Sequence, residues 1–152
     1  SALEQQLKDG LFKRIYWALV PGRLEPPSGE IDLPLGADAL KANRRAVREQ
    51  GLKAVTHYRT LETLVRPENS MEISLLELRL ITGRTHQIRV HLAHIGHPLL
   101  GDRMYGKPSP LISRQALHAR TVTFVHPTSG QEISVHAPWP EDFQQIIINL
   151  GY

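Results

Sequence analysis

A run of ten residues near the middle of the chain concentrates side chains that bind anions. Residues 83–92 read Gly-Arg-Thr-His-Gln-Ile-Arg-Val-His-Leu, so two arginines and two histidines surround a single glutamine. Gly96 and Pro98 follow, which indicates a helix that begins within the run and stops shortly after it. Guanidinium and imidazole groups bind phosphates and carboxylates through charge-assisted hydrogen bonds. The run therefore predicts a helix whose charged face meets an anion.

Arg89 is the residue of this run that most needs an anionic partner. At helical spacing it shares a face with His86, whereas Ile88 and Leu92 belong to the stripe that turns toward the core. A partly buried arginine needs a carboxylate or phosphate, because leaving its charge unpaired is costly. The run holds no acid, so the partner must come from elsewhere. One alternative is an ion pair that only holds the fold together, with Glu72, Glu77 or Asp102 as the acid.

Other kinds of chemistry are poorly supported. His91, His94 and His97 recur at three-residue spacing, but such positions diverge around a helix, whereas a catalytic zinc ion needs ligands that converge. Ser129 lies near His126 without the Gly-x-Ser-x-Gly motif of a hydrolase. The glycine spacing is not that of a phosphate-binding loop. We therefore expect solvated or capping histidines and no metal site.

Composition sets broad limits on the function. The chain has 152 residues, of which 41% are hydrophobic, and this suits one globular domain with a true core. It contains no apolar run long enough to cross a bilayer and no cysteine, which is compatible with a cytoplasmic protein. Lysine and arginine number 18 against 15 acids, a net charge of +3, which allows a polyanionic partner without requiring one.

Hydrophobic periodicity predicts the elements that must position the run. We expect helices over 2–10, 85–95 and from 140 onward. We expect strands over 12–20, 55–64, 71–81, 116–125 and 132–137, with a short edge strand over 31–35. The apolar residues of 71–81 change parity at 75–76, which predicts a bulge there. Hairpins dominate this order, so the fold class should be α+β, with a largely antiparallel mixed sheet and a few flanking helices. The basic segment 38–50 could be a helix or an exposed loop with a short strand.

Several motifs together resemble the RluA-type family of RNA pseudouridine synthases, and they cover the chain nearly from end to end. Residues 12–22 look like the family's tyrosine motif, and 83–92 with 96–102 and Tyr105-Gly106 look like its arginine motif and the turn after it. Residues 115–119, His126-Pro127 and Ala137-Pro138 also fit. The resemblance favours a loop and strand over a helix in 38–50.

The resemblance implies a reaction and a set of roles. In this family an aspartate of a His-Arg-Leu-Asp motif attacks the target uridine, whose base is detached, rotated and rejoined through carbon without cofactor or metal. Tyr16 would lie against the uracil ring, Arg89 would pair with the aspartate, and Ile88 would form the apolar floor beneath it. A carboxylate beside an arginine stays ionised, as a nucleophile must.

The chain departs from the family pattern in one important respect, because it has no His-Arg-Leu-Asp motif. The family places this motif upstream of the tyrosine motif, by more residues than precede Tyr16. We therefore expect 1–152 to be a single partial domain, the C-terminal portion of the catalytic domain, and to be inactive alone. The alternative is a non-catalytic RNA-binding module that has lost its nucleophile. Lys53 lies two residues after Gly51, not directly after it as in the family, so its role stays open.

RNA is the partner that the resemblance implies, as uridine in structured rRNA or tRNA. A uridine inside folded RNA must be flipped out before it can react, and phosphate contacts offset that cost. The residues expected to contact RNA are Lys13, Arg14, Arg44, Arg45, Arg48, Lys53, Arg84, His86 and Gln87. If strands and a carboxylate for Arg89 lie outside the chain, it should also self-associate through an exposed sheet edge.

Overall fold

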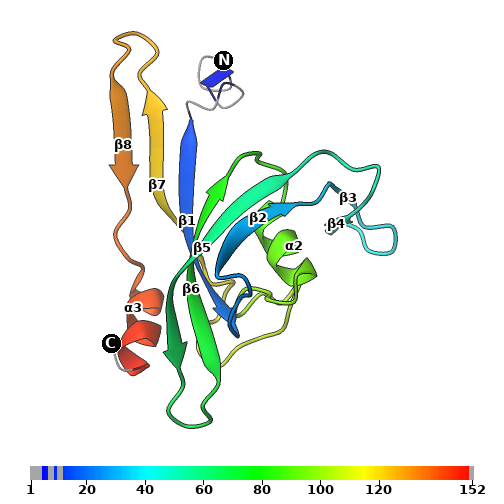
Figure 1. The fold of residues 1–152 in the computed structure, drawn as a ribbon, viewed down its shortest axis with the longest axis vertical. Helices are drawn as coiled ribbons and strands as arrows, with labels where there is room; N and C mark the ends of the chain where they lie inside the picture. The colour runs from blue at the N-terminus through cyan, green and yellow to red at the C-terminus, as the bar shows by residue number, and fades with distance from the viewer. Residues whose placement is uncertain (1–4, 7–8, 10–11, 151–152) are drawn as a thin grey trace.

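A six-stranded antiparallel sheet forms the centre of the molecule (Figure 1). The computed structural model describes residues 5–6, 9 and 12–150, and the helix expected over 2–10 lies largely outside them. The strand order is β2-β5-β6-β1-β7-β8. Its strands are β1 (Lys13–Pro21), β2 (Ser28–Asp32), β5 (Val55–Val65), β6 (Glu72–Leu80), β7 (Leu117–Val125) and β8 (Glu132–His136). The α+β prediction is confirmed, and every described strand pairing is antiparallel.

Within the described residues, one helix packs against each face of the sheet at its central strands. In β1, successive side chains point to opposite faces. Ala18 and Val20 pack in one core with residues of α2 (Gln87–His94), whereas Leu19 packs in a second core with residues of α3 (Glu141–Asn149). Among the described residues, neither helix has the length and apolar character needed to cross a bilayer.

The two cores also explain the change of parity in β6. Ile73 and Leu75 face the core under α3, whereas Leu76 and Leu78 face the core under α2. The alternation of β6 is therefore regular, and the bulge predicted at 75–76 is wrong for this strand. The irregularity lies opposite, in β5, where Leu61 is the extra residue between two pairs of the ladder. One face of β6 is buried near the start of the strand and the other near its end. The apolar residues therefore change from odd to even positions along the strand.

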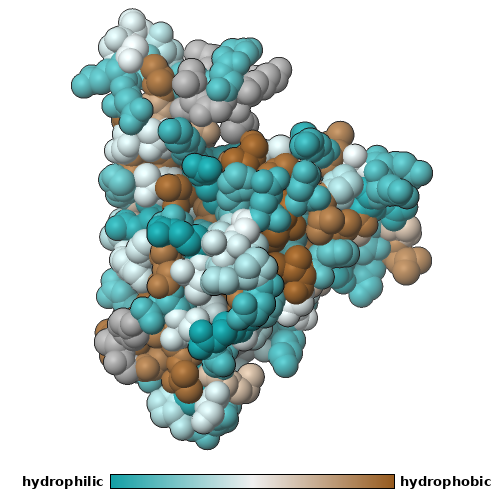
Figure 2. All heavy atoms as spheres, in the orientation of Figure 1, coloured by the Kyte–Doolittle hydropathy of each residue, from teal (hydrophilic) through white to brown (hydrophobic). Residues whose placement is uncertain are grey.

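The segment 35–47 forms an arm that projects from the sheet (Figure 1). Its strands, β3 (Leu35–Ala37) and β4 (Arg45–Val47), pair with each other and not with the main sheet. Two backbone hydrogen bonds between Leu35 and Leu52 hold its base, and Leu35 is buried with Val90 of α2. The loop-and-strand alternative for 38–50 is thus confirmed. Hydrophilic side chains gather over the arm in Figure 2.

Two element boundaries differ from the sequence prediction for local reasons. The edge strand occupies β2, three residues earlier than expected, because Pro34 cannot donate to a ladder and pairing stops before it. Helix α2 begins at Gln87 rather than at residue 85, because His86 has a left-handed backbone with φ of 57°. A non-glycine residue rarely adopts this conformation, and it turns the chain sharply into the helix.

Two isoleucines of α3 give a matched test of this packing. Ile146 is 2% exposed in the core, whereas Ile148 is 59% exposed. We expect Ile146→Ala to lower the free energy of unfolding by about 2–5 kcal/mol, because it leaves a cavity. Ile148→Ala should change it by less than about 0.5 kcal/mol. Urea denaturation measures both, and equal effects would mean that α3 does not cover the sheet as described.

Candidate functional site

The predicted site residues meet in one pocket of about 390 Å³. It opens between the start of β1, the end of β6 and the start of α2. Tyr16 and Ile88 contribute aromatic and apolar walls, and Arg89 lies beside them. The structure also brings Arg14, Arg84, His86 and Gln87 to this pocket, so seven of the predicted residues line it. Its other lining residues, which had no predicted role, are Leu80, Gly83, Gln115 and Leu117.

Arg89 finds its anion within the chain. Its Nε and Nη2 atoms donate to the two carboxylate oxygens of Asp102 at 2.9 and 2.8 Å. Asp102 is fully buried and also accepts hydrogen bonds from the backbone N–H groups of Met104 and Tyr105. The expectation that the charge of Arg89 awaits an acid outside the chain is therefore wrong. Of the three internal acids considered, the structure selects Asp102.

The environment keeps both partners of this pair charged. Burial alone would raise the pKa of Asp102, but the hydrogen bonds from Arg89 and the two backbone N–H groups outweigh it and lower that pKa. The hydrogen bond to Asp102 raises the pKa of Arg89. A bidentate pair also fixes the plane of the guanidinium group. Arg89 is thus held in a single orientation at the edge of the pocket.

The side chain of Gln87 joins α2 to β5, a role that the sequence did not predict. Its side chain is buried, and its amide nitrogen donates to the carbonyl of Val55 and the hydroxyl of Thr56. Its amide oxygen accepts from the hydroxyl of Thr82 and the backbone N–H of Arg84. All four hydrogen bonds of the amide are made internally. The prediction that Gln87 contacts RNA is therefore wrong for its side chain, which instead fastens α2 to β5.

The same hydrogen-bond chain continues through His91. Its Nε2 lies 2.9 Å from the carbonyl of Leu33 and must donate to it, so Nδ1 accepts from the Thr56 hydroxyl at 2.8 Å. This arrangement needs a neutral ring, and burial lowers the pKa of His91 below its ordinary value of 6.5. His97 similarly bonds the carbonyl of Pro21 through Nδ1. Among the described residues no three acidic, histidine or cysteine side chains are grouped to hold a metal ion.

Arg14 lines the pocket, and part of its guanidinium group has no hydrogen-bond partner in the described part of the chain. Its Nε and Nη2 atoms are buried and make no hydrogen bond within the described part of the chain. The side chain lies over Gly83, where an added Cβ would come within 2.5 Å of Nη2. A buried donor without a partner is costly, so this position favours an incoming anion.

The remaining basic residues lie outside the pocket but partly next to it. Gly83 and Arg84 also line a neighbouring hollow of about 440 Å³, which the arm borders with Arg45. Arg44 and Arg48 belong to the arm and its base, Lys13 is exposed on β1, and Lys53 lies 3.9 Å from the carboxylate of Asp32. The pocket and the hollow beside the arm thus adjoin at Gly83 and Arg84, while Arg44 lies 4.0 Å from the carboxylate of Asp38.

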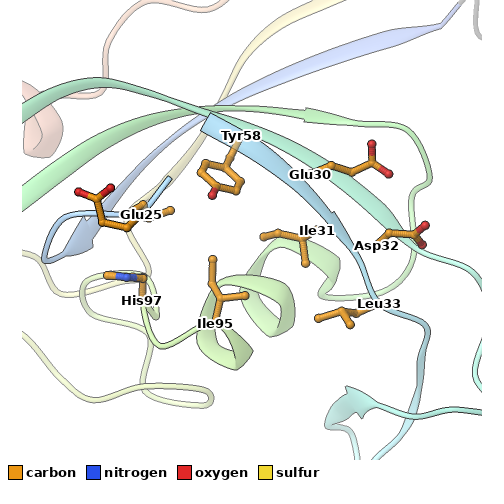
Figure 3. Close-up of a pocket in the computed structure, with 9 residues that line it drawn as sticks. Glu25, Glu30, Ile31, Asp32, Leu33, Tyr58, Ile95 and His97 are labelled. Atoms are coloured by element: carbon orange, nitrogen blue, oxygen red, sulfur yellow. The ribbon is translucent and has the colours of Figure 1, made fainter. Parts of the chain in front are cut away.

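A third hollow, of about 420 Å³, has the opposite character (Figure 3). Ile31 and Ile95 face each other across it, and Glu25, Glu30 and Asp32 lie at its rim. It is reached beyond the C-terminal end of α2, whereas the basic pocket lies at the N-terminal end of that helix. Its carboxylates repel phosphates, so this hollow suits a nucleic acid less well than the basic hollows around the start of α2.

The Arg89–Asp102 pair yields a test by double-mutant cycle. We expect Arg89→Ala and Asp102→Ala each to lower the free energy of unfolding by about 3–5 kcal/mol, because each leaves a buried charge uncompensated. The double variant should lose much less than the sum. Urea denaturation of all four proteins gives the coupling energy, and a value within about 0.5 kcal/mol of zero would show that the pair does not exist.

His91 yields a pH prediction whose sign follows from its lowered pKa. Between the folded pKa and 6.5, the unfolded chain binds a proton that the folded chain does not. The contribution of His91 to the free energy of unfolding is therefore complete above pH 6.5. It is lost as the pH falls from 6.5 through the folded pKa, by at most about 1.4 kcal/mol per pH unit.

Urea denaturation between pH 7.5 and 5.5 measures this slope. His91→Gln should flatten it, whereas His94→Gln, at an exposed position, should not. His86, whose pKa is also lowered by burial and by Arg89, adds to the slope in both variants. A slope unchanged by His91→Gln would contradict the neutral buried ring.

Comparison with known proteins identifies the family. The profile for RNA pseudouridylate synthases matches residues 1–94. The uncharacterized RNA pseudouridine synthase YhcT of Bacillus subtilis (strain 168) is 45% identical over 146 residues, which are 96% of this chain and 47% of that protein. Ribosomal large subunit pseudouridine synthase D of Nitrosomonas europaea is 43% identical over 154 residues, covering 95% of this chain and 43% of the relative.

Solved structures agree with the sequence relatives. Human RNA pseudouridylate synthase domain containing 1 superposes with a TM-score of 0.74 and 26% identity, over 91% of this chain and 59% of that one. Domain containing 4, at 22% identity and a TM-score of 0.71 over 97% and 65% of the two chains, shares the fold. The chain spans about half the length of the curated relatives it matches. The RluA-type resemblance is confirmed, and the chain belongs to the RNA pseudouridylate synthase family.

Proposed function

We propose that this chain forms part of an enzyme that isomerises uridine to pseudouridine in structured RNA. The observation that carries the proposal is the pocket itself, in which Tyr16, Ile88 and Arg89 line one cavity with two further arginines. The chain belongs to a family whose members are named for this reaction. No cofactor or metal is invoked.

The pocket offers distinct surfaces to a flipped nucleotide. Tyr16 and Ile88, with Leu80 and Leu117, present aromatic and apolar area suited to stacking against a uracil ring. Arg14 and Arg84 supply charge for the phosphates on either side, and the backbone N–H groups at the start of α2 add a partial positive charge. Base and backbone of one nucleotide thus find complementary walls.

The nucleophile is the component that the pocket lacks. None of its lining residues within the described part of the chain is acidic. Asp102 is fully buried, and both its oxygens are bonded to Arg89, so it cannot reach a sugar carbon. We propose that the attacking carboxylate comes from a part of the protein outside these 152 residues, and that 1–152 is the C-terminal portion of a catalytic domain.

The proposal extends to the kind of RNA that is modified and to the compartment in which the protein acts. One relative is named as a synthase of the large ribosomal subunit, which supports ribosomal RNA, with transfer RNA as the other candidate. Both occur in the cytoplasm, where we propose that the protein acts. The sheet edges are β2 and β8, and self-association along one of them stays a prediction that sedimentation at increasing concentration would check.

A non-catalytic RNA-binding module is the second candidate, and one observation favours it. Arg89 is already neutralised by Asp102, so its own charge does not require a further carboxylate. The coding sequence upstream of Ser1 distinguishes the two. A His-Arg-Leu-Asp motif there indicates an enzyme, whereas a stop codon or an unrelated linker indicates a binding module.

RNA binding by the isolated chain tests what both candidates share. We expect Arg84→Ala to weaken binding of bulk tRNA and to reduce the slope of log K against log salt by about 1, because one phosphate contact is lost. Arg66→Ala is the control, since Arg66 pairs with Glu68 in the turn between β5 and β6. Equal effects of the two substitutions, measured by filter binding across salt concentrations, would place the RNA elsewhere.

Turnover by the same chain tests where the nucleophile lies. The 152-residue chain should release no tritium from transcripts labelled at uridine C5, although it binds them. Release above the background of a Tyr16→Ala control would show that the chain holds its own nucleophile.

A further inference from the structure

Tyr105 lies where the arm meets the pocket. It follows Asp102 in the segment after α2, and its backbone N–H donates to that carboxylate at 3.2 Å. Its ring lies 5.0 Å from the guanidinium carbon of Arg44 in the arm and 5.1 Å from that of Arg89 in the pocket. One aromatic ring thus receives a cation from each of the two regions.

The arm depends on such contacts for its position. A two-stranded sheet is marginally stable by itself, and the bonds between Leu35 and Leu52 hold only its base. Nearer the tip, the backbone N–H of Arg45 donates to the hydroxyl of Tyr105 at 2.9 Å. This bond and the stacking of Arg44 tie the outer half of the arm to the body of the protein.

The same hydroxyl reaches into the pocket. It lies 2.7 Å from Nδ1 of His86, and the two rings meet edge to face with centroids 5.5 Å apart. The Tyr105 oxygen accepts the N–H of Arg45, and we assign the proton of the hydroxyl to a hydrogen bond with Nδ1 of His86, the acceptor within reach. A neutral His86 then carries its proton on Nε2. The ring therefore offers the pocket an N–H donor.

We propose that Tyr105 is a positioning residue that couples the arm to the pocket, so that its hydroxyl, held by the arm, keeps His86 as an Nε2–H donor for an acceptor oxygen of the bound nucleotide. The inference rests on the proposed function for its ligand, although the hydrogen-bond chain itself does not.

The geometry separates this role from simple packing. Two hydrogen bonds meet at the Tyr105 hydroxyl, one from the backbone N–H of Arg45 and one with Nδ1 of His86. The hydroxyl is thus the link between the arm and the pocket. A phenylalanine at this position would keep the ring and both cation contacts but remove the hydroxyl. Tyr105→Phe should thus leave the folded structure intact while uncoupling the arm from His86.

The experiment compares Tyr105→Phe with Tyr58→Phe in the 152-residue chain. Tyr58 is a matched control, because its hydroxyl also donates to the protein, at the carbonyl of Pro26, outside the basic pocket. Nitrogen-15 spectra of the histidine rings report which nitrogen of His86 carries the proton. Titration with fluorescein-labelled bulk tRNA gives the dissociation constant.

The wild-type chain and the Tyr58→Phe variant should show His86 with its proton on Nε2. Tyr105→Phe should give a mixture of tautomers, and its dissociation constant for tRNA should rise about ten-fold, the factor expected for one hydrogen bond. A purely structural role would lower the midpoint of thermal unfolding without changing the tautomer.

Two results would overturn the proposal. One is a wild-type His86 protonated on Nδ1, and the other is a Tyr105→Phe variant in which both the tautomer and tRNA binding are unchanged. Failure of the wild-type chain to bind tRNA is a different outcome, since it contradicts the proposed function and removes the ligand from the coupling. The tautomer measurement in the free protein would then still decide whether Tyr105 fixes His86.

Discussion

The buried amide of Gln87 is the constraint on which the site depends. It joins two residues of β5 to the turn that leads into α2, and it is completed by Thr56 and His91. Because all donors and acceptors of the Gln87 amide are used in these hydrogen bonds, they hold the first turn of α2 in a defined position on the sheet. His86, Ile88 and Arg89 take their places in the pocket from that registration. Chemistry on the exposed side of the helix is thus set by hydrogen bonds on its buried side.

The Arg89–Asp102 pair extends this order to the segment after α2. A partly buried arginine and a buried aspartate are tolerated together because each offsets the desolvation cost of the other. The backbone N–H groups of Met104 and Tyr105 complete the hydrogen bonds of the carboxylate. The pair therefore also fixes Tyr105, which carries the arm. A guanidinium group that is already paired can still accept a further anion at its edge, since an arginine has five N–H donors.

The family resemblance implied that Tyr16 and Ile88 lie beside Arg89. Period-two and helical patterns were enough to predict both long hairpins and the two helices that pack against the sheet. They failed where a single residue depends on the tertiary structure. The partner of Arg89 could not be chosen among three acids, because nothing local to Asp102 distinguishes it from Glu72 or Glu77. Gln87 looked like a polar surface residue of a charged helix, and only the position of β5 buries it. His86 reads as helical, but its left-handed backbone delays the start of the helix to Gln87.

The basic character of the surface has to be considered together with its geometry. Three arginines line the pocket and more lie along the arm, yet Arg89 is neutralised, and the third hollow is acidic. Net charge alone would not locate a polyanion on the surface, whereas this distribution favours the start of α2 and the arm as the place for the RNA of the proposed function. A phosphate backbone lying along the arm brings the next nucleotides toward Arg84 and Arg14, where the guanidinium atoms of Arg14 have no protein partner. The unpartnered guanidinium group of Arg14 thus favours an anion beside Tyr16, where the flipped base of the proposed function would enter.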